Sequence, residues 1–339
     1  MKKTIAALTA LLLFALIFTC AVPAGAKTSL VTPYSLSDGI EKLRSQFQYG
    51  KVGNMDYRYF TPCDESKDTG SYPLVVFCHG IKEGYTEGEQ INRHYFANWS
   101  SLEYQRRFAA GGAYILMPRS PQDNGNWWAS STTPMVKAII DDFVKHHNVD
   151  TSRIYIGGFS IGGRAAYQLV DAYPNFFAAA IVMSPYTTAT AAETSVLAKI
   201  PVWFFGCNTD TMVNYTISYK AVWDEIVKKS EHPEACRFTT FTRTVDPDGN
   251  VISNNHETWH ALTCEMHTPD GKDWPYCSTV DGTGKPVTFA KDEGVIAWLN
   301  GCARTAPSSS SEGRARANVF TKILTFFRRI ISLFTGLFR

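Results

Sequence analysis

Short apolar runs alternate with amphipathic segments through the middle of the chain. The runs are rich in β-branched and aromatic residues, as strands are, and the longer segments between them repeat apolar positions at helical spacing. The predicted strands cover residues 56–61, 73–78, 113–117, 153–156, 178–183, 201–205 and 237–242, and the predicted helices cover residues 134–147, 164–170, 218–229 and 292–300. This alternation predicts an α/β fold with a mostly parallel central sheet and helices on both faces. Residues 243–289 are the least regular part of the chain and are predicted to form an insertion near the functional site.

The first residues have the pattern of a secretory signal. Lys2 and Lys3 precede an apolar stretch over residues 6–22, and Ala24-Gly25-Ala26 has the small-residue pattern of a cleavage site. We therefore expect residues 1–26 to be a signal peptide, so that the protein is exported and is either secreted or attached to the cell surface. An uncleaved membrane anchor is the alternative. Residues 27–303 then have the length of one α/β catalytic domain.

The last residues differ in pattern from the body. Residues 304–318 are rich in Ser, Ala and Arg, which predicts a flexible linker. Residues 319–339 repeat apolar side chains at helical spacing with basic residues between them, which predicts a basic amphipathic helix. Lys322, Arg328 and Arg329 argue against a membrane-spanning helix. We expect this helix to bind a membrane or envelope surface, and docking on its own domain or on a second copy is the alternative.

The charge balance excludes a nucleic-acid-binding body. The chain has 33 basic and 31 acidic residues, a net charge of +2, and its C-terminal residues are enriched in arginine. The remaining body is mildly acidic and has neither a basic stripe nor a nucleic-acid-reading motif.

The cysteines predict thiols and disulfides rather than a metal site. Of the 8 cysteines, Cys20 lies in the predicted signal, and the odd number that remains leaves at least one thiol free or paired between chains. Cys78 lies in an apolar run and is the first candidate for a buried free thiol, whereas Cys264 and Cys277 bracket a polar loop that they could staple. No cysteine spacing fits a metal pattern, and for the chemistry described below we expect neither a metal nor an organic cofactor.

The pattern G-x-S-x-G at residues 158–162 is the strongest chemical signal. A predicted strand enters it and a predicted helix leaves it, which is the context in which Ser160 becomes an exposed nucleophile on a sharp turn. The alternative is a glycine-rich turn with an incidental serine.

A reactive serine needs a base, and the base needs a carboxylate to orient it. Asp210 follows the predicted strand 201–205, where catalytic groups of parallel sheets lie, although an Asx-turn or helix cap is its other interpretation. His256 then comes in the expected order of serine, acid and histidine. His260 is the next candidate and His267 another, and a solvent-facing loop histidine is the alternative for each.

The developing oxyanion needs backbone donors. We expect one from the amide of Ile161, which follows the nucleophile, and the other from the amide of Ile81, or of Gly80, after the strand 73–78. His79 is predicted to hold that loop rather than to act as the base.

These motifs resemble those of a known family. His79-Gly80, the residues around Ser160, the D-x-x-V element at Asp210–Val213 and the H-x-x-W element at His256–Trp259 are similar to α/β-hydrolases of the extracellular esterase group. That group includes feruloyl and acetylxylan esterases, polyhydroxybutyrate depolymerase-like proteins and predicted peptidases near prolyl oligopeptidase. The resemblance covers about residues 55–300 and implies the α/β-hydrolase fold. The chain departs from it where the acid's strand ends in Phe205-Gly206-Cys207 instead of a His-Gly pair, and in its longer segment 261–288.

The loop 118–128 would rim the pocket in such a fold. Its Trp127, beside Trp128, is a candidate to stack on a sugar or an aromatic acyl group. Anchoring of the loop by burial of the tryptophans is the alternative.

Together these features predict an exported serine hydrolase that cleaves carboxylic esters through an acyl-enzyme. The resemblance implies a carbohydrate esterase acting on feruloyl or acetyl groups of plant polysaccharides. The alternatives are a serine peptidase of the prolyl oligopeptidase type, and a catalytically silent protein on the same fold that binds carbohydrate or envelope.

Overall fold

A central β-sheet organises the part of the chain that the computed structural model describes, which comprises residues 34–84, 86–91, 94–120, 127, 131–246, 250–263, 266, 274–290 and 293–304. The predictions for residues 1–26 and 305–339 lie outside these residues. From one edge to the other, the strands are β1 (Gln48–Val52), β2 (Met55–Phe60), β4 (Tyr114–Pro118), β3 (Tyr72–Cys78), β5 (Val149–Phe159), β6 (Ala179–Met183), β7 (Val202–Cys207), β8 (Arg237–Phe241), β9 (Cys277–Asp281) and β10 (Pro286–Val287).

The centre of the sheet is parallel and its edges are antiparallel. Neighbours from β4 through β3, β5, β6 and β7 to β8 pair in parallel. The β1–β2 hairpin pairs antiparallel with β4 at one edge, and β9 and β10 add antiparallel strands beyond β8 at the other. The parallel strands therefore all end at the same edge, and the loops that leave this edge can meet in one place.

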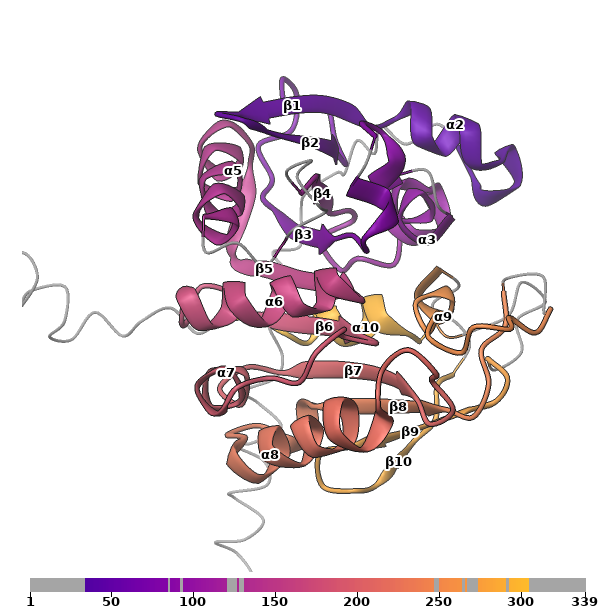
Figure 1. The fold of residues 1–339 in the computed structure, drawn as a ribbon. Coiled ribbons are helices and arrows are strands. Elements are labelled where there is room, and N and C mark those ends of the chain that lie inside the picture. Colours follow the sequence, from indigo (N-terminus) through magenta and orange to yellow (C-terminus); the bar gives the residue numbers. More distant parts are fainter. Residues whose placement is uncertain are drawn as a thin grey trace, which may run out of the picture. The chain divides into compact units, whose positions relative to one another are not determined.

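Helices cover both faces of the sheet (Figure 1). The α-helices are α2 (Ile40–Ser45), α3 (His94–Ala97), α4 (Leu102–Gln105), α5 (Thr132–His146), α6 (Ile161–Ala172), α7 (Ala191–Leu197), α8 (Ala221–Lys229), α9 (His260–Thr263) and α10 (Val295–Asn300), and α8 is preceded by the π-helical segment η5 (Tyr215–Lys220). Helices α5 to α8 pack on one face, and α2, α3, α4 and α10 pack on the other.

Strand β3 shows how the pleat builds these two cores. Leu74 and Val76 belong to the core under α5 and α6, whereas Val75 and Phe77 belong to the core under α3 and α10. Alternate side chains of a strand point to opposite faces, so a strand that is apolar throughout is buried on both sides. The predicted mostly parallel sheet with helices on both faces is confirmed.

Several elements differ from the prediction. Strand β1 was not predicted, and the irregular stretch 243–289 contributes β9 and β10 to the sheet. The helix predicted over residues 218–229 starts earlier, at η5, because the side chain of Asn214 caps it by accepting a hydrogen bond from the Ile217 amide at 3.1 Å.

The structure also bears on the cysteines, on membrane-spanning helices and on metal sites. Cys78 is a fully buried, unpaired thiol, as predicted, whereas Cys264 lies outside the described residues. Within the described ranges, no helix is long and apolar enough to cross a membrane, and no group of three or more His, Cys, Asp or Glu side chains forms a metal-binding cluster.

Candidate active site

Ser160 occupies a sharp turn between β5 and α6. Its φ of 54° and ψ of −122° are unusual for a residue with a side chain, and such strain persists only where the surroundings enforce it. The Ser160 amide donates to the Met183 carbonyl at 3.0 Å. A Cβ atom at Gly158 would overlap the Gly162 carbonyl, and one at Gly162 would overlap the Cys78 carbonyl. The two glycines therefore let α6 begin directly against the sheet, with Ser160 at its positive end.

Three side chains that are far apart in the sequence meet at the carboxyl edge of the sheet. His256 Nε2 lies 3.0 Å from Ser160 Oγ, and His256 Nδ1 lies 2.7 Å from Asp210 Oδ2. The imidazole and the carboxylate are almost completely buried, with side-chain exposures of 3% and 0%. A proton on Nδ1 satisfies the carboxylate and leaves Nε2 free to accept the hydrogen bond of the serine hydroxyl. The three side chains therefore form one hydrogen-bonded series from the serine hydroxyl through the imidazole to the carboxylate.

The carboxylate of Asp210 receives four hydrogen bonds. Its Oδ1 accepts from the amides of Met212 at 2.8 Å and Val213 at 3.0 Å, and its Oδ2 accepts from the Tyr219 hydroxyl at 2.6 Å and from His256. Burial raises the pKa of Asp210, but the hydrogen bonds and the charge of His256 outweigh it, so the pKa lies below its usual value. Asp210 therefore stays ionised at neutral pH.

Tyr219 is the member of this cluster that the sequence analysis missed. It was assigned only a place in the helix 218–229, since no motif marks it. The available signal was Gly206 in β7, because a Cβ atom there would lie 2.7 Å from Tyr219 Cδ2. A glycine at the end of a buried strand often marks the close approach of another group.

His79 braces the loop that follows β3. Its Nε2 accepts from the Ser120 amide at 3.0 Å, and its Nδ1 donates to the Gly80 carbonyl at 2.5 Å. Burial lowers the pKa of His79 to about 4, so the ring is neutral at pH 7. The same loop carries Ile81, which is 45% exposed. Ile161 is the first residue of α6, where helix amides have no acceptor within the helix.

Trp127 lies inside the core rather than at the surface. It is 1% exposed, its Nε1 donates to the His79 carbonyl at 2.9 Å, and its ring lies 4.9 Å from the His79 ring. This position favours the anchoring of the loop over stacking on a substrate. Trp128 lies outside the described residues.

The other candidate histidines do not take the place of His256. His260 Nε2 lies 3.0 Å from a carboxylate oxygen of Glu257, three residues earlier in the chain. His267 lies outside the described residues.

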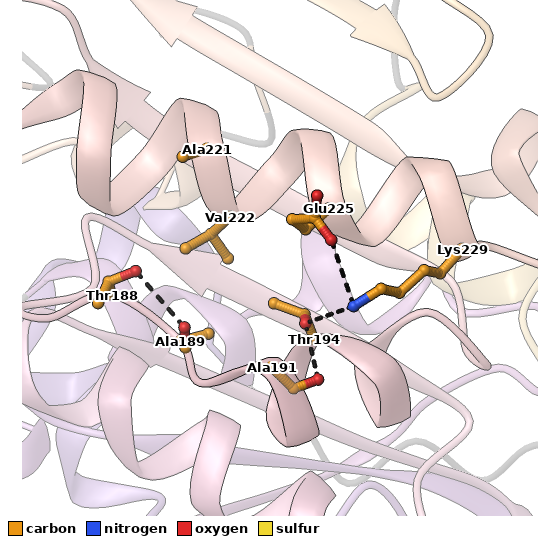
Figure 2. Close-up of a pocket in the computed structure, with 8 residues that line it drawn as sticks. All are labelled: Thr188, Ala189, Ala191, Thr194, Ala221, Val222, Glu225 and Lys229. Carbon is orange, nitrogen blue, oxygen red and sulfur yellow. Dashed lines mark hydrogen bonds and ion pairs between the residues drawn. The ribbon is translucent and has the colours of Figure 1, made fainter.

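A surface pocket of about 280 Å³ lies between α7 and α8 (Figure 2). Its walls are formed by Thr188, Ala189, Ala191, Thr194, Ala221, Val222, Glu225 and Lys229. Lys229 Nζ bonds Thr194 Oγ1 at 3.2 Å and lies 3.3 Å from Glu225 Oε2. None of the three clustered side chains lines this pocket, so it is not where Ser160 would meet a substrate.

Comparison with known proteins relates the fold and the site to a family. The phospholipase/carboxylesterase family model matches residues 114–244, which include Ser160 and Asp210. The crystal structure of a thermostable esterase is similar with a TM-score of 0.56 and 24% sequence identity, over 65% of this chain and 60% of that one. The chain has the α/β-hydrolase fold.

Curated relatives of this chain include proteins named as an acetylxylan esterase and a depolymerase. The bifunctional acetylxylan esterase/xylanase of Neocallimastix patriciarum is 25% identical over 260 residues, which cover 71% of this chain and 35% of the relative. Poly(3-hydroxyalkanoate) depolymerase C of Paucimonas lemoignei is 26% identical over 143 residues, which cover 38% of this chain and 32% of the relative. The chain thus spans about a third of the length of these relatives. The resemblance to the extracellular esterase group is confirmed by these matches.

Proposed function

We propose that this α/β-hydrolase cleaves carboxylic esters through an acyl-enzyme, with Ser160 as nucleophile, His256 as general base and Asp210 as the group that orients the base. The observation that carries the proposal is the hydrogen-bonded series from Ser160 Oγ through His256 to Asp210, with distances of 3.0 and 2.7 Å. Such a series activates a hydroxyl that is otherwise a weak nucleophile.

In the first half-reaction, Ser160 Oγ forms a bond to the ester carbonyl carbon while its proton passes to His256 Nε2. The resulting imidazolium is stabilised by Asp210, which the four hydrogen bonds keep ionised. The tetrahedral intermediate then collapses, the alkoxide leaves with the proton from Nε2, and an acyl group remains on the serine.

The negative oxygen of the intermediate would be held by the amides of Ile161 and Ile81. Each such donor is worth about 3–4 kcal/mol in other serine hydrolases. In the second half-reaction, water gives a proton to His256 and attacks the acyl-serine, which releases the carboxylic acid and restores the enzyme.

The proposed substrates are acetyl or feruloyl esters of plant polysaccharides. This choice is supported by the relatives named as acetylxylan esterases, of which the protein from Emericella nidulans is a further example at 22% identity over 138 residues. Peptide bonds are the competing substrates, because acyl-enzyme chemistry alone does not separate esters from amides.

Two measurements test the proposal. Purified protein is first treated with a fluorophosphonate probe, and we expect labelling that is abolished in Ser160→Ala. The protein is then assayed with aryl esters, methyl ferulate, acetylated xylan and short peptides, and we expect turnover of esters. Absence of labelling next to an active control enzyme would refute the serine mechanism, and cleavage of peptides without esters would refute the substrate class.

Export and surface attachment are part of the proposal and depend on the sequence patterns alone. Residues 1–26 have the pattern of a secretory signal, and residues 319–339 have that of a basic amphipathic helix. Deletion of residues 313–339 should release the protein from anionic liposomes. Unchanged partitioning would contradict the attachment.

A further inference from the structure

Tyr219 contacts the candidate acid and the candidate base together. Its hydroxyl lies 2.6 Å from Asp210 Oδ2, the oxygen that also receives the hydrogen bond of His256, and 3.4 Å from His256 Nδ1. Ser160, Asp210 and His256 come from the predicted motifs, whereas Tyr219 comes from the π-helical segment η5. Such segments often lie at functional sites.

The ring of Tyr219 is held in place on several sides. It is fully buried, its centroid lies 6.3 Å from that of Phe204 and 6.1 Å from that of Tyr215, and it covers Gly206 so closely that a Cβ atom there would collide with it. With the ring held in this way, the hydroxyl lies within hydrogen-bond distance of the carboxylate. The interaction is therefore built into the packing of β7 against η5.

Tyr219 can only act as the donor in this contact. Asp210 is ionised and offers acceptors alone. Burial raises the pKa of Tyr219, and the adjacent charge of Asp210 raises it further. The titratable groups that face the phenol are Asp210, His256 and Tyr167, and none of them would remove its proton near neutral pH.

We propose that Tyr219 is a positioning residue for the reaction: by donating to Asp210 Oδ2 it fixes the carboxylate and limits how strongly that carboxylate attracts a proton on His256. The proposal rests on the proposed function, since it assigns His256 the role of base. A phenol that shares the negative charge of Oδ2 leaves less of it facing the imidazole. Without the phenol, the protonated form of the His256 imidazole is favoured. On lowering the pH, His256 then becomes protonated, and unable to act as a base, at a higher pH than in the parent.

The change Tyr219→Phe tests this inference, because it removes one oxygen atom and keeps the ring. The gap it leaves is too small for a water molecule, so no solvent replaces the donor. We expect kcat on an aryl ester to fall roughly tenfold, as for a modest misplacement of a catalytic group, with KM little changed. The acidic limb of kcat/KM should shift upward by about half a pH unit, since its position reports the base of the free enzyme.

Tyr215→Phe is the matched control. Tyr215 lies on the same segment, and its hydroxyl bonds Thr240 Oγ1 at 3.0 Å instead of the acid. This variant should keep the pH profile of the parent. Incorporation of 3-fluorotyrosine at position 219 provides a second variant that preserves the contact, and because its phenol is a stronger donor, it should shift the acidic limb downward.

The ring titration of His256 is followed by NMR in the parent and in Tyr219→Phe, since this readout needs no turnover. A higher titration midpoint in Tyr219→Phe supports the inference even if the parent cleaves no ester, in which case the proposed function alone fails. A pH profile and a titration identical to those of the parent overturn it. A fall in kcat with neither shift also overturns it, because that result indicates a purely structural role.

Discussion

Replacement of Gly162 by alanine tests how closely α6 must approach the loop that follows β3. Gly162 is the second residue of α6, and in most helices a glycine-to-alanine change stabilises by about 0.5–1 kcal/mol. Here the added Cβ would lie 2.5 Å from the His79 carbonyl oxygen and would overlap the Cys78 carbonyl. Both neighbours are backbone atoms at the end of β3, so neither can rotate away.

The size of the effect follows from the space required. A Cβ atom needs at least 3.0 Å to such an atom, so the gap must widen by about 0.5 Å at the His79 carbonyl oxygen and by about 1 Å at the Cys78 carbonyl oxygen, which would lie 2.0 Å away. This movement separates Ser160 and Ile161 from the loop of Ile81. A misplacement of about 1 Å costs on the order of 100-fold in rate. Overpacking costs roughly 1–3 kcal/mol, which exceeds the gain in helix propensity.

The assay is kcat/KM on an aryl ester together with thermal unfolding. We expect Gly162→Ala to lose about 100-fold in kcat/KM and to melt several degrees lower. Gly163→Ala is the matched control, because its Cβ would lie 3.1 Å from the nearest atoms of Pro185, a contact that small movements relieve. If Gly162→Ala kept the activity of the parent and melted at the same temperature or higher, the argument from close approach would be wrong.

Three further changes give separate tests. Asp210→Asn should lower kcat on an aryl ester by about 10³–10⁴-fold, as the corresponding change does in other serine hydrolases, and a loss below tenfold would contradict the orienting role. Because burial holds the pKa of His79 at about 4 in the folded protein, against 6.5 ordinarily, the unfolded chain binds more protons between these values. The free energy of unfolding should therefore fall as the pH drops through this window, by about 3 kcal/mol at its lower end. Guanidinium unfolding of His79→Gln at several pH values should lack this part of the pH dependence. If the variant kept the same dependence of stability on pH as the parent, the buried neutral His79 would be excluded as its cause. Gly206→Ala should displace the Tyr219 ring and lower both kcat and the melting temperature. Values equal to those of the parent would show that the ring can move to accommodate the added Cβ atom without loss of function.

Much of the fold could be predicted because its central strands are buried on both faces. The run 178–183 was predicted as a strand, and the structure has β6 at Ala179–Met183, with every residue buried. A continuous apolar run of this length is typical of a parallel strand. Strands β1 and β9 escaped prediction because they lie toward the edges and are partly exposed. Backbone hydrogen bonds to β2 and β8 hold them in the sheet. Because these bonds do not depend on side chains, the pattern of hydrophobic and polar residues within the strands does not reveal the pairing.

The candidate site was predictable where the chemistry requires a residue type at a given place. The glycines around Ser160 are needed locally by the turn, and Asp210 follows a buried strand. Tyr219 had no such requirement, because its role depends on η5 lying over Gly206. For Trp127 the sequence suggested a function that the structure does not favour. The local sequence is the same whether a tryptophan is exposed at the rim of a pocket or buried as an anchor of its loop.

By itself, the sequence determined the α/β class, the turn at Ser160 and the order of the candidate acid and base, because hydrophobic periodicity and turn chemistry are local properties of the chain. Only the tertiary structure decided which histidine lies beside the serine, 96 residues away, and which phenol completes the hydrogen bonds of the acid. Hydrogen bonds operate over about 3 Å, so they depend on the register and packing of distant segments, which no short stretch of sequence contains.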